Sequence, residues 1–460
     1  MRPSAPLSTS LPPLVMGTAT FNSQYNADPY ALPTTELVQR ALSRGIRAFD
    51  TSPYYGPAEE LLGRALATDF VQSNFPRSSY HLLTKVGRIS SGCFDYSATW
   101  VNYSVRRSLR RLHTEYLDVV YCHDVEFVSP AEVLAAVREL RRLRDEDGLV
   151  QYVGISGYPV DVLSDLAELV LRETGEPLDI VMSYANYTLQ NTRLHSIALP
   201  RLLAAGVDVV PNASPLGMGL LRRDGVPIGS MGDFHPAPND LRTAVQLASQ
   251  CATSHGEKLE VVAIRFALES WMRVGAKVGA LGAPLARPLD AAPGFLSVAN
   301  VGTGTRLGVS VMGVSNIEEL DETWRVWHSI LDGLENYNDD ESELDGVSSA
   351  DNDLPSGVVS TASHASKIIT PSEGLITDRA WSVERSANIM LLATQIRERI
   401  GDWVDYVWAS PPADFKNSLS DEHVATLRRL EAEMETRPSL EFSVQDAMLT
   451  PPLDIENHLS

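Results

Sequence analysis

The stretch that organises this chain is Ala48-Phe49-Asp50-Thr51-Ser52-Pro53-Tyr54-Tyr55-Gly56, which runs from a strand into a loop. The apolar run 46–49 is typical of a buried strand, and Asp50 and Tyr55 follow at its carboxyl end. Two similar runs, 81–84 and 117–122, are followed by Lys85 and His123. An acid, a phenol, an amine and an imidazole at successive strand ends are groups that proton transfer requires and packing does not. The pattern predicts a reactive site at one end of a parallel sheet.

Outward from this stretch, β-rich apolar runs alternate with segments of helical period from Pro13 to about Glu335. Such alternation is typical of βαβ units. The strand candidates are 14–20, 46–50, 81–85, 117–123, 150–155, 180–184, 207–211 and 309–312. The helix candidates are 35–44, 58–67, 99–112, 130–146, 160–172, 193–205, 240–255, 259–272 and 317–334. The fold class predicted is α/β, a closed (β/α)8 TIM barrel with its functional residues at the strand carboxyl ends.

An open, doubly wound sheet is the alternative arrangement of the same elements. That fold requires a glycine-rich turn after its first strand, and Gly17 stands alone there. The barrel is therefore favoured.

Composition excludes several classes of protein. The chain has 460 residues, 44% of them hydrophobic, a formal net charge of −21 and a pI near 4.9. Nucleic acids are bound by clusters of Lys and Arg, so we expect no nucleic-acid partner. The cysteines, at positions 93, 122 and 251, have neither disulfide-framework nor metal-ligand spacing, so no metal is expected. No run reaches the roughly 18 apolar residues that span a bilayer, which predicts no membrane association and a cytoplasmic location.

Four segments depart from a minimal barrel. Residues 1–335 are predicted to form the barrel, and 275–308, rich in Gly, Ala and Pro, a surface loop inserted in it. Residues 336–377 are acidic and poor in large apolar side chains, so we expect a disordered insert. Helical period resumes within 378–410, over Arg385–Trp408, which predicts a C-terminal helix docked on the barrel. The tail 411–460 holds one amphipathic piece, Asp421–Met434.

The polar strand-end residues suggest a mechanism for proton transfer. A phenol with its ordinary pKa of about 10 is a poor proton carrier at neutral pH. Lys85, held by Asp50, is expected to lower the pKa of Tyr55, and His123 is expected to orient the substrate oxygen or relay its proton. Each residue alone also has an ordinary interpretation, as a turn residue or a solvated strand end. Their joint placement at one barrel rim favours catalysis.

These residues resemble the tetrad of the aldo-keto reductases: Asp50 and Tyr55 within Asp-Thr-x-x-x-Tyr-Gly, Lys85 within Leu-Leu-Thr-Lys, and His123 within Tyr-Cys-His. The resemblance spans residues 13–335. It implies a (β/α)8 barrel in which the tyrosine is the general acid or base and hydride passes between a nicotinamide and a carbonyl or alcohol carbon without a metal. The loops 21–26, 48–57, 121–127 and 212–220 further resemble those of fungal NAD-dependent aldose dehydrogenases, which oxidise a sugar at C1 to its lactone.

The resemblance also implies a cofactor site. Ser156 and Ser183 fall where the family contacts the nicotinamide amide, although the usual Asn and Gln appear here as Gly157 and Ser183. The pyrophosphate loop corresponds to Ser214, Pro215, Leu216 and Met218, and the start of the last helix to Gly313, Ser315, Asn316 and Glu319. NADP-dependent members carry Lys and Arg where Gly313 and Glu319 stand here. A carboxylate repels a 2′-phosphate and accepts hydrogen bonds from ribose, which predicts NAD over NADP. The alternative is that Glu318 and Glu319 only complement the helix dipole.

The expected substrate is a small aldose, with D-arabinose, L-galactose and L-fucose left open. Its C1 would lie against a rim of Phe21, Tyr25, Tyr54, His123 and Phe127, although aromatic rim residues also serve loop packing. A monomer or homodimer is expected. Two other functions remain alternatives: an NADP-dependent aldo-keto reductase of other aldehydes or of sugars such as L-galactose or L-fucose, and a nucleotide-binding regulatory subunit that works through a partner.

Overall fold

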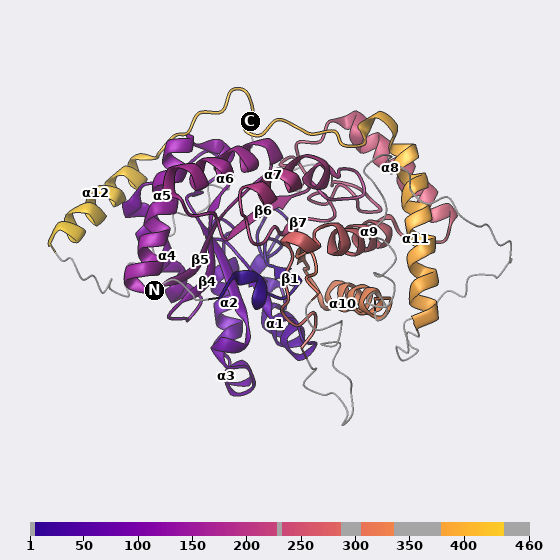
Figure 1. The fold of residues 1–460 in the computed structure, drawn as a ribbon, viewed down its shortest axis with the longest axis horizontal. Helices are drawn as coiled ribbons and strands as arrows, with labels where there is room; N and C mark the ends of the chain where they lie inside the picture. Colours follow the sequence, from indigo (N-terminus) through magenta and orange to yellow (C-terminus); the bar gives the residue numbers. More distant parts are fainter. Residues whose placement is uncertain (1–4, 228–231, 287–304, 335–378, 437–460) are drawn as a thin grey trace.

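A computed structural model describes residues 5–227, 232–286, 305–334 and 379–436. Its strands form one closed parallel barrel in which each strand pairs with the next and the last pairs with the first, confirming the predicted fold (Figure 1). The strands are β1 (Leu14–Gly17), β2 (Ala48–Asp50), β3 (His81–Val86), β4 (Leu117–His123), β5 (Val150–Gly157), β6 (Ile180–Tyr184), β7 (Asn212–Ala213) and β8 (Ser310–Gly313).

Amphipathic helices surround the barrel. They are α1 (Thr34–Ser43), α2 (Ala58–Leu66), α3 (Asp69–Asn74), α4 (Ala98–Arg111), α5 (Pro130–Arg142), α6 (Val160–Thr174), α7 (Leu199–Ala204), α8 (Asn239–Ser254), α9 (Leu259–Val274), α10 (Ile317–Asp332), α11 (Arg379–Ile400) and α12 (Asp421–Thr436). At the start of α5, Ser129 and Glu132 form a reciprocal capping box, which satisfies two otherwise free amide groups. Two of the predicted helices contain a π-helical turn, at Leu143–Asp147 and Leu194–Ala198.

Strand seven lies further along the chain than predicted. We expected it at 207–211, whereas β7 is Asn212–Ala213. The expected residues are nevertheless extended beside β6, because the carbonyl of Val209 accepts a 3.0 Å hydrogen bond from Val181 N. Pro211 has no amide hydrogen and cannot donate to a strand ladder, which shortens the regular strand.

The helix predicted over Arg385–Trp408 ends early. α11 stops at Ile400, and Gly401 follows with a φ of +61°, a left-handed conformation that commonly ends helices. α11 packs against α8 and α9 through Ile389, Leu392 and Ile396, on the right of Figure 1. α12 lies on the opposite side, against α4.

The segment expected as a surface loop at 275–308 is packed where the structure describes it. Ala280 and Leu285 are 1% and 4% exposed. Ala280 pairs with Leu307 in an isolated antiparallel bridge, and the glycines around it allow close backbone approach, since a Cβ on Gly282 would lie 2.4 Å from the carbonyl of Leu11. Residues 287–304 and the acidic insert at 336–377 lie outside the described residues. Among the helices described, none has the length and apolar character needed to cross a bilayer.

Candidate active site

Alternation along the strands directs three of the predicted residues into the barrel. Successive side chains of a strand point to opposite faces of the sheet. Asp50, Lys85 and His123 each lie two positions after a side chain of the apolar cluster inside the barrel, namely Ala48, Leu83 and Tyr121. All three therefore share the interior face, at its carboxyl end.

Lys85 and Asp50 form an ion pair inside the barrel. The Nζ atom of Lys85 lies 2.6 Å from Oδ1 of Asp50 and donates a second hydrogen bond, of 2.8 Å, to the carbonyl of Thr51. Burial raises the pKa of Asp50, and the ammonium of Lys85 opposes that rise. The pair places the ammonium of Lys85, already matched by the carboxylate of Asp50, beneath the loop that follows β2.

Tyr55 projects from that loop over the ion pair, with its ring centre 4.8 Å from Lys85 Nζ. Burial, and then the negative charges of Asp50 and Asp124, raise the pKa of Tyr55 well above its ordinary value. This is opposite to the lowering that we expected from Lys85. The physical reason is that the ammonium is already paired with Asp50, while the phenol lies in a site with little water. The phenol keeps its proton at neutral pH.

His123 lies at the end of β4 beside Tyr55. Its ring centre is 5.7 Å from that of Tyr55, and the two planes are nearly perpendicular, at 88°. Its Nδ1 atom lies 3.1 Å from Oγ of Ser52. Burial lowers the pKa of His123 to about 3, so the imidazole is neutral at physiological pH.

The structure adds two charged residues to the site that the sequence reasoning missed. Arg88 forms a salt bridge with Asp124 and donates a 3.0 Å hydrogen bond to the hydroxyl of Tyr54. Asp124 Oδ2 also lies 3.6 Å from His123 Nε2. Burial opposes ionisation of Asp124, but the neighbouring imidazole of His123 and the guanidinium of Arg88, which also donates a hydrogen bond to the carboxylate, hold its pKa below the ordinary value. The sequence held a clue to both residues, because each is close in sequence to a tetrad residue: Arg88 follows Lys85 by three positions, and Asp124 directly follows His123.

Residues 401–420, which we name the C-terminal strap, cross the loops at this end of the barrel. Trp408 stacks on Tyr158 with 4.7 Å between ring centres. Ser410 Oγ donates a 2.9 Å hydrogen bond to Glu126 Oε1. Further along, Asn417 exchanges two 2.8 Å hydrogen bonds with the backbone of Phe94. A segment more than 200 positions away in sequence therefore contacts the loops after β3, β4 and β5.

The predicted aromatic rim is only partly assembled. Phe21 is fully buried in the core, and its amide donates a hydrogen bond to the carbonyl of Thr18, so its side chain presents no surface to the barrel mouth. Tyr54 lies beside His123, with 5.8 Å between ring centres. Tyr25 makes an edge contact with Phe234. Phe127 is half-buried, stacked on Phe94 and covered at its edge by Phe415 of the strap.

The two serines predicted to meet the nicotinamide amide lie at the ends of adjacent strands, β5 and β6. Ser156 and Ser183 are both buried, and Ser183 Oγ accepts a 3.0 Å hydrogen bond from Asn186. The structure explains the glycine that stands beside Ser156. A Cβ on Gly157 would come 2.4 Å from Oε2 of Glu126, so the glycine makes room for this carboxyl group.

The loop after β7 has an unusual backbone. Ser214, Gly217, Met218 and Gly219 all have positive φ angles, between 56° and 93°. The loop is held by its own hydrogen bonds, including one of 2.8 Å from Met218 N to Ser214 Oγ. Pro215 is buried, while Leu216 is half-buried against the core.

The start of α10 lies beside Gly313, at the end of β8. Asn316 caps the helix by accepting a 2.8 Å hydrogen bond from Glu319 N, and Glu319 Oε2 accepts one of 2.7 Å from Ser315 N. The first-turn amides of a helix have no partner within the helix, so this end offers donors to an anion. Glu319 takes part in the capping and places a carboxylate beside those donors.

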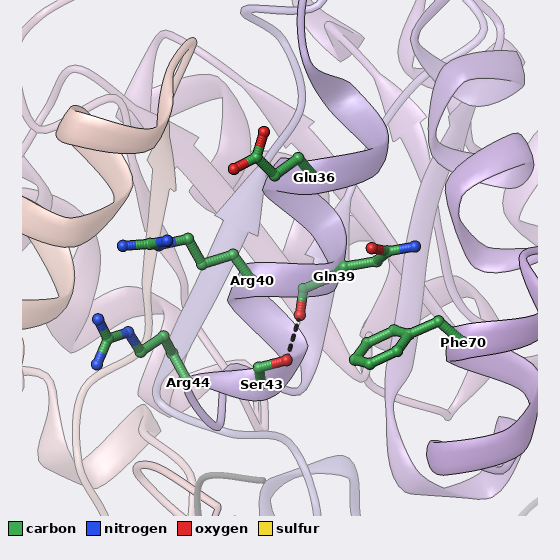
Figure 2. A pocket seen from close by; sticks show the side chains of 6 residues that line it. All are labelled: Glu36, Gln39, Arg40, Ser43, Arg44 and Phe70. Atoms are coloured by element: carbon green, nitrogen blue, oxygen red, sulfur yellow. Dashed lines mark hydrogen bonds between the residues drawn. The ribbon is translucent and has the colours of Figure 1, made fainter. Parts of the chain in front are cut away.

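A separate surface groove of about 300 Å³ lies in the outer helix layer. Figure 2 shows that the guanidinium groups of Arg40 and Arg44 point to one side of α1, whereas Phe70 of α3 lies on the other side. Arg40 is paired with Asp321 of α10. None of the predicted site residues lines this groove, so it is not part of the strand-end site.

Comparison with known proteins agrees with this geometry. The sequence model of the Aldo/keto reductase family matches residues 13–336. The chain is 42% identical to D-arabinose 1-dehydrogenase of Saccharomyces cerevisiae over 268 residues, which cover 58% of this chain and 78% of that protein. It is 37% identical to L-galactose dehydrogenase of Arabidopsis thaliana over 234 residues, covering 50% and 68%. It is 28% identical to D-threo-aldose 1-dehydrogenase of Pseudomonas sp over 261 residues, covering 51% and 75%.

The family match covers most of the chain and all of the barrel, and it includes every residue of the predicted tetrad. Members of this family are oxidoreductases that use nicotinamide cofactors. With its barrel and its relatives established, the chain belongs to the aldo/keto reductase family.

Proposed function

We propose that this protein catalyses the NAD-dependent oxidation of a small aldose at C1 to the aldono-1,4-lactone, with D-arabinose as the preferred sugar. The observation that carries the proposal is the meeting of Tyr55, Lys85 and His123 at the carboxyl end of the barrel, with Asp50 beneath them. The likeness to a D-arabinose 1-dehydrogenase and an L-galactose dehydrogenase supports a sugar as substrate.

The tetrad residues divide the work of proton transfer. When bound, a nicotinamide would supply the acceptor for the hydride that leaves C1. Tyr55 first releases its phenolic proton to solvent and, as the phenolate, accepts the proton of the anomeric hydroxyl, with the ammonium of Lys85 4.8 Å from its ring centre. The ion pair with Asp50 keeps Lys85 in place beneath the ring. His123, neutral at physiological pH, makes a hydrogen bond with the reacting oxygen.

Several features support a nicotinamide dinucleotide at the strand ends. The hydroxyl groups of Ser156 and Ser183 lie on adjacent strands where the amide would bind. Ser214, Pro215, Leu216 and Met218 would border the pyrophosphate, and the free amides at the start of α10 suit a phosphate. The same helix end, with Gly313, Ser315 and Asn316, also bears Glu319, whose carboxylate would repel an added 2′-phosphate. The proposed cofactor is therefore NAD.

The experiment is a set of initial-rate assays that follow the absorbance of reduced nicotinamide. D-arabinose, L-galactose and L-fucose are each paired with NAD and with NADP. We expect the highest kcat/KM with D-arabinose and NAD. Activity with NADP alone would contradict the role given to Glu319, and activity only with non-sugar alcohols would contradict the substrate class.

A matched variant separates chemistry from folding. Tyr55→Phe removes only the hydroxyl, so turnover should be lost while NAD binding, followed by quenching of tryptophan fluorescence, changes less than a few-fold. Loss of both turnover and binding would mean that Tyr55 is structural. No turnover in the wild type with any sugar, alongside tight NAD binding, would favour a regulatory subunit.

A further inference from the structure

Ser52 makes a direct contact with the imidazole of the proposed tetrad. It lies in the loop after β2 and is 1% exposed. Its Oγ atom is 3.1 Å from Nδ1 of His123 and accepts a 3.1 Å hydrogen bond from Tyr54 N. Ser52 was given no role in the sugar chemistry above. Its contact with Nδ1 influences which ring nitrogen of His123 carries the hydrogen.

The hydroxyl of Ser52 has one hydrogen to donate. The amide of Tyr54 uses one of its lone pairs. Among the hydrogen bonds of the described residues, the contact with His123 Nδ1 is the only one in which the Ser52 hydroxyl can be the donor. A buried hydroxyl hydrogen without an acceptor is costly, so the hydroxyl donates to Nδ1. Nδ1 therefore carries a lone pair and no hydrogen.

The other ring nitrogen leads independently to the same tautomer. Nε2 of His123 lies 3.6 Å from Oδ2 of Asp124. A carboxylate attracts an N–H group and repels a lone pair, so the hydrogen is favoured on Nε2. Burial keeps the imidazole neutral, and a neutral imidazole has a single N–H. In the opposite tautomer, with the hydrogen on Nδ1, the hydroxyl hydrogen of Ser52 would have no acceptor. The lone pair on Nε2 would then face the carboxylate of Asp124.

We propose that Ser52 is a positioning residue that holds His123 as the Nε2–H tautomer, so that the imidazole offers a hydrogen-bond donor to the reacting oxygen beside the Tyr55 hydroxyl. The tautomer itself follows from contacts within the protein. Its use towards a sugar oxygen rests on the proposed function. A lone pair on Nε2 would instead repel that oxygen and misplace it relative to Tyr55.

The test is long-range proton–nitrogen correlation NMR of the histidine rings. The chain contains an internal reference, because His235 Nε2 lies 2.9 Å from the carbonyl of Gly217 and its Nδ1 accepts from Ala237 N. A carbonyl only accepts hydrogen bonds, so His235 must be the Nε2–H tautomer. We expect His123 to show the same pattern as His235. The opposite pattern in the wild type would overturn the proposal without any variant.

Substitution then tests the role of the serine. Ser52→Ala should give His123 a mixture of tautomers, while the signals of His235 stay unchanged. kcat should fall about tenfold, as expected for one lost hydrogen bond, with a smaller effect on KM. Ser52→Thr keeps a hydroxyl and should restore both the tautomer and the rate. An unchanged His123 pattern in Ser52→Ala would refute the role of Ser52.

These outcomes separate the two proposals. If the wild-type protein has the Nε2–H tautomer but oxidises no sugar, the proposed function is contradicted and the tautomer assignment is kept. If the protein oxidises D-arabinose while His123 is the Nδ1–H tautomer, the proposed function is supported and the role of Ser52 is contradicted.

Discussion

Lys85 and Asp50 face each other inside the barrel, with 2.6 Å between Nζ and Oδ1 and side chains that are only 1% and 5% exposed. An ion pair so far from water is stable only while both partners are present, since either charge alone has lost its hydration. The pair is thus a structural element of the barrel as well as part of the candidate site.

Removing one member of this pair should therefore destabilise the fold. Lys85→Met leaves the Asp50 carboxylate without a partner, and we expect a loss of about 3–5 kcal/mol in the free energy of unfolding. The double variant Lys85→Met with Asp50→Asn removes both charges and should recover part of that loss. Urea denaturation of the two single variants and the double variant measures the coupling. Strictly additive losses would show that the two groups do not stabilise one another.

The direction of the Tyr55 shift predicts how the reaction responds to pH. Burial and nearby carboxylates raise the pKa of Tyr55, so the phenol is protonated at neutral pH. Sugar oxidation requires the phenolate, and its kcat/KM should rise as pH increases above neutrality. Carbonyl reduction requires the protonated phenol and should not gain from the same change. Rate profiles in both directions check this, and a sugar-oxidation rate that falls between pH 7 and 9 would contradict it.

Glu126 should make the fold less stable as pH rises. Burial, followed by the charge of Asp124, raises its pKa from 4.5 to about 8. The folded protein therefore holds a proton that the unfolded chain releases, and the stability present below pH 4.5 is lost as pH rises towards 8. Glu126→Gln is neutral throughout, so it should remove this contribution. Thermal unfolding across the window measures it.

A matched control for Glu126 is Glu398→Gln on the exposed face of α11. This variant should keep the wild-type dependence of melting temperature on pH. If Glu126→Gln and the wild type lose stability in parallel between pH 4.5 and 8, then Glu126 is ionised in the folded protein and the prediction is wrong.

Asn417 should anchor the C-terminal strap. Its side chain makes two hydrogen bonds to the backbone of Phe94, and Phe415 covers Phe127 nearby. Asn417→Ala should weaken this attachment by about 1 kcal/mol, because the hydrogen bonds lie near the surface. Limited proteolysis should then cut the strap faster. Lys416→Ala, an exposed neighbour, is the control. Equal cleavage of the two variants would mean that Asn417 does not hold the strap.

The barrel and the tetrad were predictable because they depend on local patterns. Apolar runs alternate with helical segments, and a strand repeat of two residues places Asp50, Lys85 and His123 on one interior face. The errors in the predicted element boundaries also have physical causes. Pro211 displaced β7, and Gly401 ended α11, each through a single backbone property that periodicity does not register.

The sequence by itself determined the fold class, the family and the reactive groups, since each follows from residue types at fixed short spacings. Only the tertiary structure decided how those groups behave. It buried Tyr55 and reversed the expected direction of its pKa shift, placed Phe21 in the core, and brought Arg88 and Asp124 to His123. It also laid the strap, with Ser410, across Glu126. Burial and charge depend on neighbours that are distant in sequence, and local patterns hold no information about which neighbours those are.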